Sequence, residues 1–256
     1  MTIPNLAEIE EKLSHENLDD WLKLWAIEQG PAKPAALALM AAVVPGAPDA
    51  GLRVLDLCCG PGDASRAIQA RFPGATVDGV DRDTFLASLC KAVNRRRGIP
   101  GRVLVRNLEQ DDWLADFAGP YDVVVVTNAL HWFQLARVKA LLDQVWSALR
   151  PGGLFLFMEP VSPDPALAAG YAAWHATQPP QHQWQDWLNF WTRINTLLGY
   201  DHIAQLGPRD NDRLGDSLTA LNWVNLAKAA GFAPIDILLR DPEKLVAAAF
   251  RPAAGS

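Results

Sequence analysis

Apolar runs rich in branched residues alternate with helix-like patterns between residues 52 and 158. Such runs are typical of buried parallel strands, and apolar positions three or four residues apart are typical of helices. Because strands that alternate with helices need crossover connections, the pattern predicts an α/β fold with a doubly wound, mostly parallel sheet. The expected strands are 52–57, 75–80, 102–106, 121–127 and 153–158, and the expected helices lie near 63–71, 83–97 and 134–148.

Helical spacing also marks both ends of the chain. One helix is expected over Leu6–Gln29, where Gly30-Pro31 ends it, and another over Pro34–Val44. Near the C-terminus, a helix is expected over Ser217–Ala230, ended by Gly231. Two apolar segments follow, at 235–239 and 244–250, and the alanines of the second favour a helix by propensity alone.

The segment from Pro160 to Leu221 breaks the alternation of strands and helices. It is rich in proline and contains four tryptophans, Trp174, Trp184, Trp187 and Trp191. We interpret residues 160–222 as short helices in an inserted cap. No repeat or low-complexity linker interrupts the chain, so residues 1–256 are expected to form a single domain.

Glycines and acids follow the first two expected strands. Leu52–Leu57 leads into the turn Cys58-Cys59-Gly60-Pro61-Gly62, and the second strand ends in Asp81. Turn glycines let the backbone approach a ligand closely, and the start of the next helix offers unpaired N–H groups. An acid one crossover later is placed to accept hydrogen bonds from a ribose. A cofactor that carries a nucleoside is therefore the first hypothesis.

Four motifs follow one another along the chain, Asp56–Gly62, Asp81, Tyr121–Asn128 and Leu149–Leu154, and they cover roughly residues 50 to 160. In this order they resemble the motifs of the class I S-adenosylmethionine-dependent methyltransferases, in particular the small-molecule group that includes trans-aconitate methyltransferase. The resemblance implies a Rossmann-like, seven-stranded sheet that an antiparallel C-terminal hairpin closes. It also implies S-adenosyl-L-methionine as cofactor and N-terminal helices, residues 1–46, over the cleft.

The resemblance also implies roles for individual residues. Asp56 would anchor the methionine tail, unless it only caps the turn, and Asp81 would bind both ribose hydroxyls. Cys58 stands where the family often has glycine, and Asn107 where it commonly has an aspartate that binds the adenine amino group. A shift of register would replace Asn107 with Glu109, Asp111 or Asp112. The full cofactor-binding set is Asp56, Cys58, Gly60, Gly62, Asp81, Arg82, Asn107, Leu108 and Asn128.

Residues 128–133, Asn-Ala-Leu-His-Trp-Phe, follow the fourth strand and contain the candidate catalytic residue, His131. Methyl transfer mainly needs alignment, and a base is needed only if the nucleophile starts protonated. Histidine suits that task near neutral pH, although an equally good interpretation is that His131 holds the loop or orients the cofactor tail. Other candidates are His175, His182 and His202 in the cap, and Glu159 at the end of the fifth strand.

Tryptophans are the main clue to the methyl acceptor. Trp25 and Trp21 are candidate lid residues, although packing of their helix on the core is an equally good interpretation. Aromatic side chains over the cleft favour a planar or largely apolar acceptor. The expected acceptor-binding residues are Trp25, Trp132, Trp174, Trp187 and Trp191.

Composition narrows the classes of partner. The formal net charge of −6 argues against nucleic acid as substrate, and the basic run 94–97 is explained by a helix C-terminus. Three cysteines form no disulfide framework, and the acidic first thirty residues resemble neither a signal peptide nor a membrane span. Adjacent Cys58 and Cys59 lack the spacing of a metal site. We expect a cytoplasmic protein that binds no metal, as a monomer or homodimer.

Two other functions remain open. An NAD-dependent oxidoreductase would share the glycine turn and Asp81, but it prefers a third glycine where this chain has Ser65. A protein that binds an adenosyl ligand without turnover would retain every cofactor motif, because methyl transfer requires no obligatory base.

Overall fold

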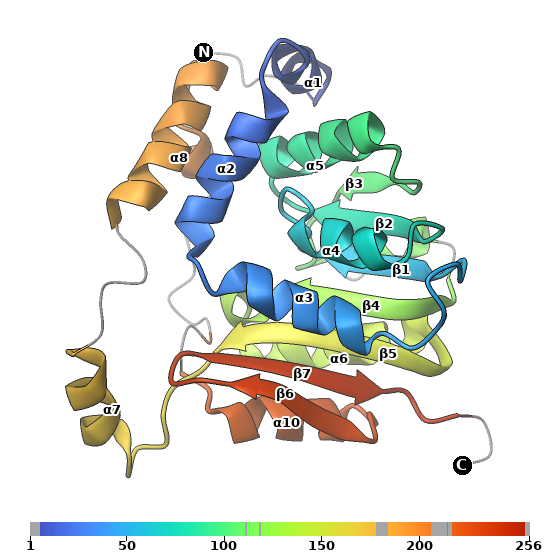
Figure 1. Cartoon of the computed structure of the whole chain (residues 1–256), viewed down its shortest axis with the longest axis vertical. Helices are drawn as coiled ribbons and strands as arrows, with labels where there is room; N and C mark the ends of the chain where they lie inside the picture. Colours follow the sequence, from blue (N-terminus) through green and yellow to red (C-terminus); the bar gives the residue numbers. More distant parts are fainter. Residues whose placement is uncertain are drawn as a thin grey trace.

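The computed structural model describes residues 6–110, 112–117, 119–177, 184–205, 214 and 217–253. Its centre is a seven-stranded sheet with the order β3-β2-β1-β4-β5-β7-β6 (Figure 1). The first five strands are parallel, and β7 runs antiparallel to both β5 and β6. The strands are β1 (Arg53–Leu57), β2 (Thr76–Asp81), β3 (Val103–Val105), β4 (Tyr121–Thr127), β5 (Leu149–Pro160), β6 (Ile235–Arg240) and β7 (Lys244–Phe250).

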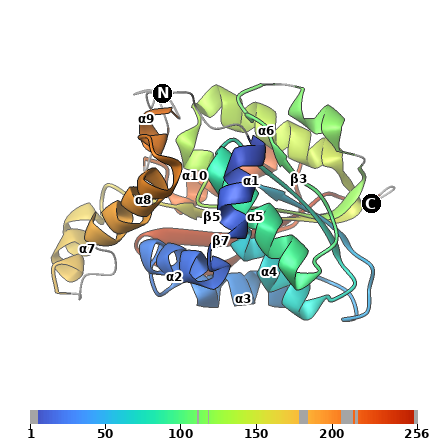
Figure 2. The same ribbon diagram turned by 90° about the horizontal axis from the view of Figure 1, so that it is seen from above.

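Helices cover both faces of this sheet. Adjacent residues of a strand point to opposite faces, so each strand contributes apolar side chains to the core on both sides. Val54 and Val123 pack with α3 and α4, whereas Leu55 and Val124 pack with α6 and α10. Seen from above, the two groups of helices lie on opposite sides of the strands (Figure 2). These helices are α3 (Lys33–Val43), α4 (Asp63–Arg71), α6 (Leu135–Ala148) and α10 (Ala220–Ala229).

A third apolar cluster lies beside the sheet and joins distant parts of the chain. It packs α1 (Leu6–Ser14), α2 (Leu18–Gln29) and α8 (Trp184–Leu198) against α5 (Thr84–Arg97). Trp21 and Phe190 are fully buried at its centre. The inserted segment therefore packs on the N-terminal helices. We call α1, α2 and α8 the helical lid.

Three predicted boundaries were wrong. The expected helix Leu6–Gln29 is two helices, because Asn17 accepts a hydrogen bond from the Asp19 N–H and caps a new helix. The fifth strand begins at Leu149 and ends at Pro160, longer than expected at both ends. The last helix begins only at Ala220, where Thr219 and Asn222 form a capping box.

The inserted segment contributes two further helices, α7 (Ala168–His175) and α9 (His202–Gln205). Both lie on the side of the molecule where the parallel strands reach their carboxyl ends (Figures 1 and 2). His175 on α7 contacts Glu243 in the turn between β6 and β7. Two of the candidate site residues, Asp111 and His182, lie outside the described residues. Within the described part of the chain, no helix is both long and apolar enough to cross a membrane.

Candidate active site

The candidate site lies where strand order reverses. β1 pairs with β2 on one side and with β4 on the other, and ligands of such sheets bind at the carboxyl ends of the strands beside this point. Asp56 and Asp81 lie near the ends of β1 and β2, Asn128 directly follows β4, and Glu159 lies at the end of β5. The fold thus brings the predicted motifs to one edge of the sheet.

The turn after β1 has the backbone conformation that its glycines permit. Gly60 and Gly62 have φ of +51° and +85°, and Gly62 is the N-cap of α4. Cys58 also has a positive φ, +51°. That conformation favours glycine, which gives a physical reason for the glycine often found at this position in the family that the chain resembles. The turn presents the N-terminus of α4 toward the strand ends.

Asp56 and Asp81 are buried acids whose carboxylates are hydrogen-bonded only by neutral donors in the described residues. The Asp56 carboxylate accepts from Ser65 N–H at 3.1 Å and Ser65 Oγ at 2.6 Å. Asp81 accepts from Gly60 N–H at 2.8 Å and Asp83 N–H at 2.9 Å. Burial raises the pKa of Asp56 to about 7 and, with the nearby charge of Asp83, raises that of Asp81 to about 6.

Cys58 lies among the acids of three strands. Burial first, and then the negative charges of Asp81, Glu159 and Asp56, raise the pKa of its thiol, which therefore stays protonated. Asp56, Asp81 and Glu159 thus all lie near enough to Cys58 to affect its thiol. No group of three or more metal-binding side chains is found among the described residues.

The far end of this edge, beside β2 and β3, is polar and open. A hollow of about 590 Å³ is lined by Arg82 and Asn107, among others. Arg82 is exposed, while the Asn107 side chain accepts a hydrogen bond from the Glu109 N–H at 3.1 Å. Leu108 is buried in the main core, and its carbonyl accepts a hydrogen bond from Arg137. Arg137 thereby fixes the loop that carries Asn107.

His131 and Glu159 form a buried pair at the other end of this sheet edge, beside β4 and β5. Glu159 is fully buried, and His131 is 9% exposed. One Glu159 oxygen accepts from Ala129 N–H at 3.1 Å and Leu130 N–H at 2.8 Å, and the other lies 2.8 Å from His131 Nδ1. Because an ionised carboxylate only accepts, His131 Nδ1 carries the proton and Nε2 keeps its lone pair. The loop after β4 is thus held by the end of β5.

Trp25 from α2 lies directly on the glycine turn. A methyl group added at Gly60 would stand 3.5 Å from the Trp25 ring. Trp25 Nε1 donates to Asp63 at 2.7 Å, and Lys33 Nζ lies 3.0 Å from the same carboxylate. Burial alone would raise the pKa of Asp63, but Lys33 and Arg66 outweigh it and lower that pKa. A paired carboxylate therefore anchors the helical lid to the start of α4.

The other tryptophans lie in different surroundings. Trp132 is 43% exposed and contacts the His131 ring at 4.8 Å between centroids. Trp174 on α7 is also 43% exposed. Trp187 and Trp191 belong to the third cluster, where Trp191 is only 9% exposed. This geometry favours packing for Trp191, whereas Trp132 is partly exposed in the His131 loop.

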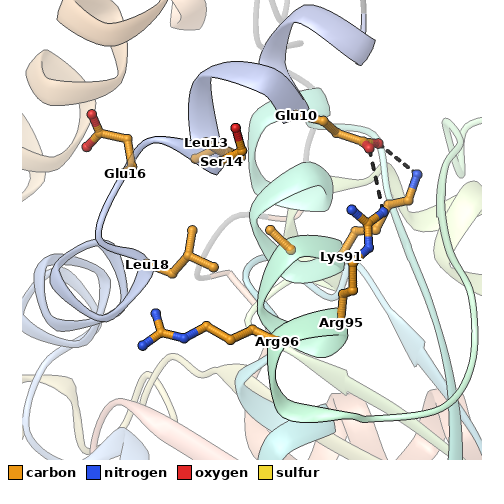
Figure 3. A pocket seen from close by; sticks show the side chains of 9 residues that line it. Glu10, Leu13, Ser14, Glu16, Leu18, Lys91, Arg95 and Arg96 are labelled. Carbon is orange, nitrogen blue, oxygen red and sulfur yellow. Dashed lines mark hydrogen bonds and ion pairs between the residues drawn. The ribbon is translucent and has the colours of Figure 1, made fainter.

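A second hollow lies away from the strand ends. It measures about 330 Å³ and lies between α1 and the later turns of α5 (Figure 3). Its cations are paired, since Glu10 lies 2.7 Å from Lys91 and 3.9 Å from Arg95. The ion pairs fasten α1 to α5, which explains these charged side chains without a ligand.

Sequence reasoning missed two supporting residues. Ser65, noted only as a residue that is not glycine, donates twice to Asp56. Lys33 is 5% exposed beside Asp63 and Trp25. No spacing in the sequence indicates either contact, because the first depends on how α4 packs on β1 and the second on how α3 packs on α4. The position of Glu159 at a strand end was the one available signal for its pairing with His131.

Comparison with known proteins decides the family. The family described as a methyltransferase domain matches residues 31–237. This chain belongs to that methyltransferase family. A trans-aconitate 2-methyltransferase of Deinococcus radiodurans is 30% identical over 77% of the chain and 68% of its own length. A trans-aconitate 2-methyltransferase of Streptomyces avermitilis is 32% identical over 50% of the chain, which spans about half of that relative (46%).

Solved structures confirm the methyltransferase fold. An O-methyltransferase family protein from Burkholderia thailandensis matches with a TM-score of 0.56 at 16% identity, over 87% of the chain and 57% of that protein. Human N-acetylserotonin methyltransferase, solved with S-adenosylmethionine, has a TM-score of 0.53 at 12% identity, over 97% and 57% respectively. The parallel sheet and its antiparallel hairpin, expected from the motifs, are thus confirmed.

Proposed function

We propose that this methyltransferase moves a methyl group from S-adenosyl-L-methionine to a small molecule whose nucleophilic atom carries a proton. The buried His131–Glu159 pair carries the proposal, because it presents a histidine lone pair at the edge of the sheet that holds the glycine turn. A carboxylate nucleophile needs no base, whereas a hydroxyl or a protonated amine does. The pair therefore favours a hydroxyl or amine acceptor.

The residues at the strand ends fit the cofactor. The glycine turn and the N-terminus of α4 offer backbone N–H groups for close contact with the cofactor, and Asp81 suits the cofactor's ribose. Asp56 and Asp81 are buried with raised pKa values, so each gains when a ligand supplies a cation or further donors. Arg82, Asn107 and Leu108 would bind the adenine end, and Cys58 and Asn128 would line the middle. When bound, S-adenosylmethionine supplies the activated methyl group.

The residues of the chain then have three tasks. Trp25 and the lid cover the glycine turn and exclude water, Trp132 lies against the acceptor, and His131 Nε2 takes the acceptor proton. By accepting from Nδ1, Glu159 fixes the tautomer of the neutral ring whose lone pair lies on Nε2, and its other oxygen holds the loop in place. Trp174, Trp187 and Trp191 remain predicted acceptor contacts, with Trp191 least favoured by its burial.

The relatives' names and the net charge support a small-molecule acceptor. Several relatives are named for trans-aconitate, a small molecule, and the net charge of −6 does not favour a phosphate backbone. We propose a small, planar or apolar acceptor and no nucleic acid, with the protein in the cytoplasm as a monomer or homodimer.

The test measures binding and turnover separately. Calorimetry with S-adenosylhomocysteine and with NAD first distinguishes a methyltransferase from an oxidoreductase. Transfer of labelled methyl from S-adenosylmethionine into a panel of phenols, alcohols, amines and carboxylic acids then identifies the acceptor class. We expect His131→Ala and Glu159→Gln to lower kcat about 100-fold and to change the Kd of S-adenosylhomocysteine less than about threefold.

The control is His175→Ala, which changes an exposed histidine paired with Glu243. It should leave kcat unaltered. Normal kcat in folded His131→Ala would remove the base from the mechanism. Binding of S-adenosylhomocysteine with no label transferred to any class would favour a non-catalytic adenosyl-binding protein.

A further inference from the structure

The inserted segment reaches the cofactor edge through one buried histidine. His202 on α9 is 2% exposed, and its Nε2 lies 2.9 Å from Asp83 Oδ1. The two residues are 119 positions apart in sequence, and their side chains are 2% and 5% exposed. A contact so well buried between segments so distant fixes the position of each relative to the other.

Asp83 connects this contact to the ribose acid. Its Oδ1 accepts from Phe85 N–H at 2.9 Å and Leu86 N–H at 3.0 Å and so caps α5. Its own N–H donates at 2.9 Å to Asp81. The carboxylate of Asp81 is therefore held partly by the backbone of Asp83. A group that holds Asp83 also determines where Asp81 points.

His202 is itself held by the inserted segment. The Trp191 ring lies nearly parallel to its imidazole, with centroids 6.2 Å apart and an interplanar angle of 18°. Asn195 Oδ1 accepts from the His202 N–H at 2.9 Å, and the Tyr200 hydroxyl lies 3.3 Å from Nδ1. With Nδ1 facing a hydroxyl that can donate, Nε2 carries the proton that Asp83 accepts.

The donor from His202 also matters electrostatically. Asp83 is 4% exposed, and its Oδ2 is buried without a hydrogen-bond partner among the described residues. A buried carboxylate is costly unless donors surround it. Asp81 lies close enough to be affected by the charge of Asp83. Removing the His202 donor would leave two buried acids side by side with fewer donors between them.

We propose that His202 is a positioning residue for the cofactor, through which the inserted segment completes the ribose end of the site by holding Asp83 and, through it, Asp81. This inference deepens the proposed function and rests on it. It gives the inserted segment a task besides contact with the acceptor.

Two variants at position 202 separate the hydrogen bond from packing. His202→Phe keeps a planar ring against Trp191 but has no donor, whereas His202→Gln keeps an N–H donor. We expect His202→Phe to weaken binding of S-adenosylhomocysteine about tenfold by calorimetry. His202→Gln should stay within about threefold of wild type, and the matched control His175→Phe in α7 should leave affinity unchanged. The KM for the acceptor should not change in any of them.

A double-mutant cycle tests whether His202 acts through Asp83. Asp83→Ser keeps a helix cap, because serine is an equally good N-cap residue, and its shorter side chain removes the carboxylate that accepts from His202. The double variant with His202→Phe should bind S-adenosylhomocysteine no more weakly than the weaker single variant. Thermal unfolding without ligand shows whether each variant is folded, and the shift in Tm on adding S-adenosylhomocysteine reports affinity a second time.

Three outcomes would overturn the inference. They are unchanged affinity in His202→Phe, equal loss in His202→Gln and His202→Phe, and additive losses in the cycle. If His202→Phe does not fold, the comparison of His202→Gln and Asp83→Ser decides, since only Asp83→Ser loses the acceptor for position 202 and should weaken binding. Failure of the wild-type protein to bind S-adenosylhomocysteine would instead overturn the proposed function.

Discussion

At the scale of single residues, the buried acids of the strand ends make the free protein sensitive to pH. Asp56 and Asp81 have pKa values of about 7 and about 6, against a usual 3.8. The folded protein therefore binds their protons more tightly than the unfolded chain does. Their contribution to stability is full below about pH 4 and is lost as pH rises through about 6 and 7.

We predict that the free energy of unfolding of the ligand-free protein falls by roughly 2 to 4 kcal/mol between about pH 5 and pH 8 because of these two groups. Urea unfolding at a series of pH values measures it. Asp56→Asn is the control, because an amide does not titrate in this pH range. This variant should lose the larger part of the slope. A wild-type slope that Asp56→Asn leaves unaltered would show that other groups cause it.

At the scale of elements, the glycine turn also allows α4 and α5 to pack closely together. A Cβ at Gly62 would lie 2.7 Å from Cys90 Sγ on α5, and Gly62 has φ of +85°. Gly98, the C-cap of α5, has φ of +67°, but a Cβ added there would meet no atom within 4 Å. The two glycines share the backbone conformation and differ in the space around them.

We predict that Gly98→Ala costs about 1 kcal/mol of stability through backbone strain alone. Gly62→Ala should cost about 2 to 4 kcal/mol, because overpacking against Cys90 adds to the same strain. Chemical unfolding of both variants measures the difference. Cys90→Ala combined with Gly62→Ala should recover the packing part only, and equal costs for the two single variants would contradict a clash.

The elements show which structural features a sequence pattern reveals. The strands reaching Asp56, Asp81 and Thr127 were predictable, because buried parallel strands are apolar throughout. The alanines of β7 favour a helix, yet Ala247 and Ala249 are fully buried between β5 and β6, so tertiary packing overrides propensity. The family resemblance predicted that hairpin, and the residue pattern alone did not.

At the scale of the whole molecule, the site depends on contacts that no local pattern specifies. Strand ends and glycines marked the edge of the sheet where the candidate site lies, because their positions follow from topology. Trp25 and His202 reach this edge from distant parts of the chain. Trp25 lies 38 positions from its partner Asp63, and His202 lies 119 positions from its partner Asp83. Their contacts depend on how the helical lid packs, so helical periodicity showed the elements and not their partners.

The packing of the helical lid is the last feature to test. Phe190 is fully buried, and its ring centroid lies 6.2 Å from Trp21, 5.1 Å from Trp25 and 5.3 Å from Trp191. Its cluster is separate from the two that cover the faces of the sheet. The lid should therefore loosen without unfolding the sheet, and loosening it frees both Trp25 and His202.

We predict that Phe190→Ala destabilises the lid by about 3 to 5 kcal/mol, as expected for loss of a buried ring. Hydrogen exchange should accelerate in α1, α2 and α8 while β1, β4 and β5 keep their protection, and affinity for S-adenosylhomocysteine should fall. Phe155→Ala, in the core beneath the sheet, is the control and should expose the strands as well. Equal acceleration in lid and strands of Phe190→Ala would mean that both unfold as one unit, in which case the lid does not open by itself.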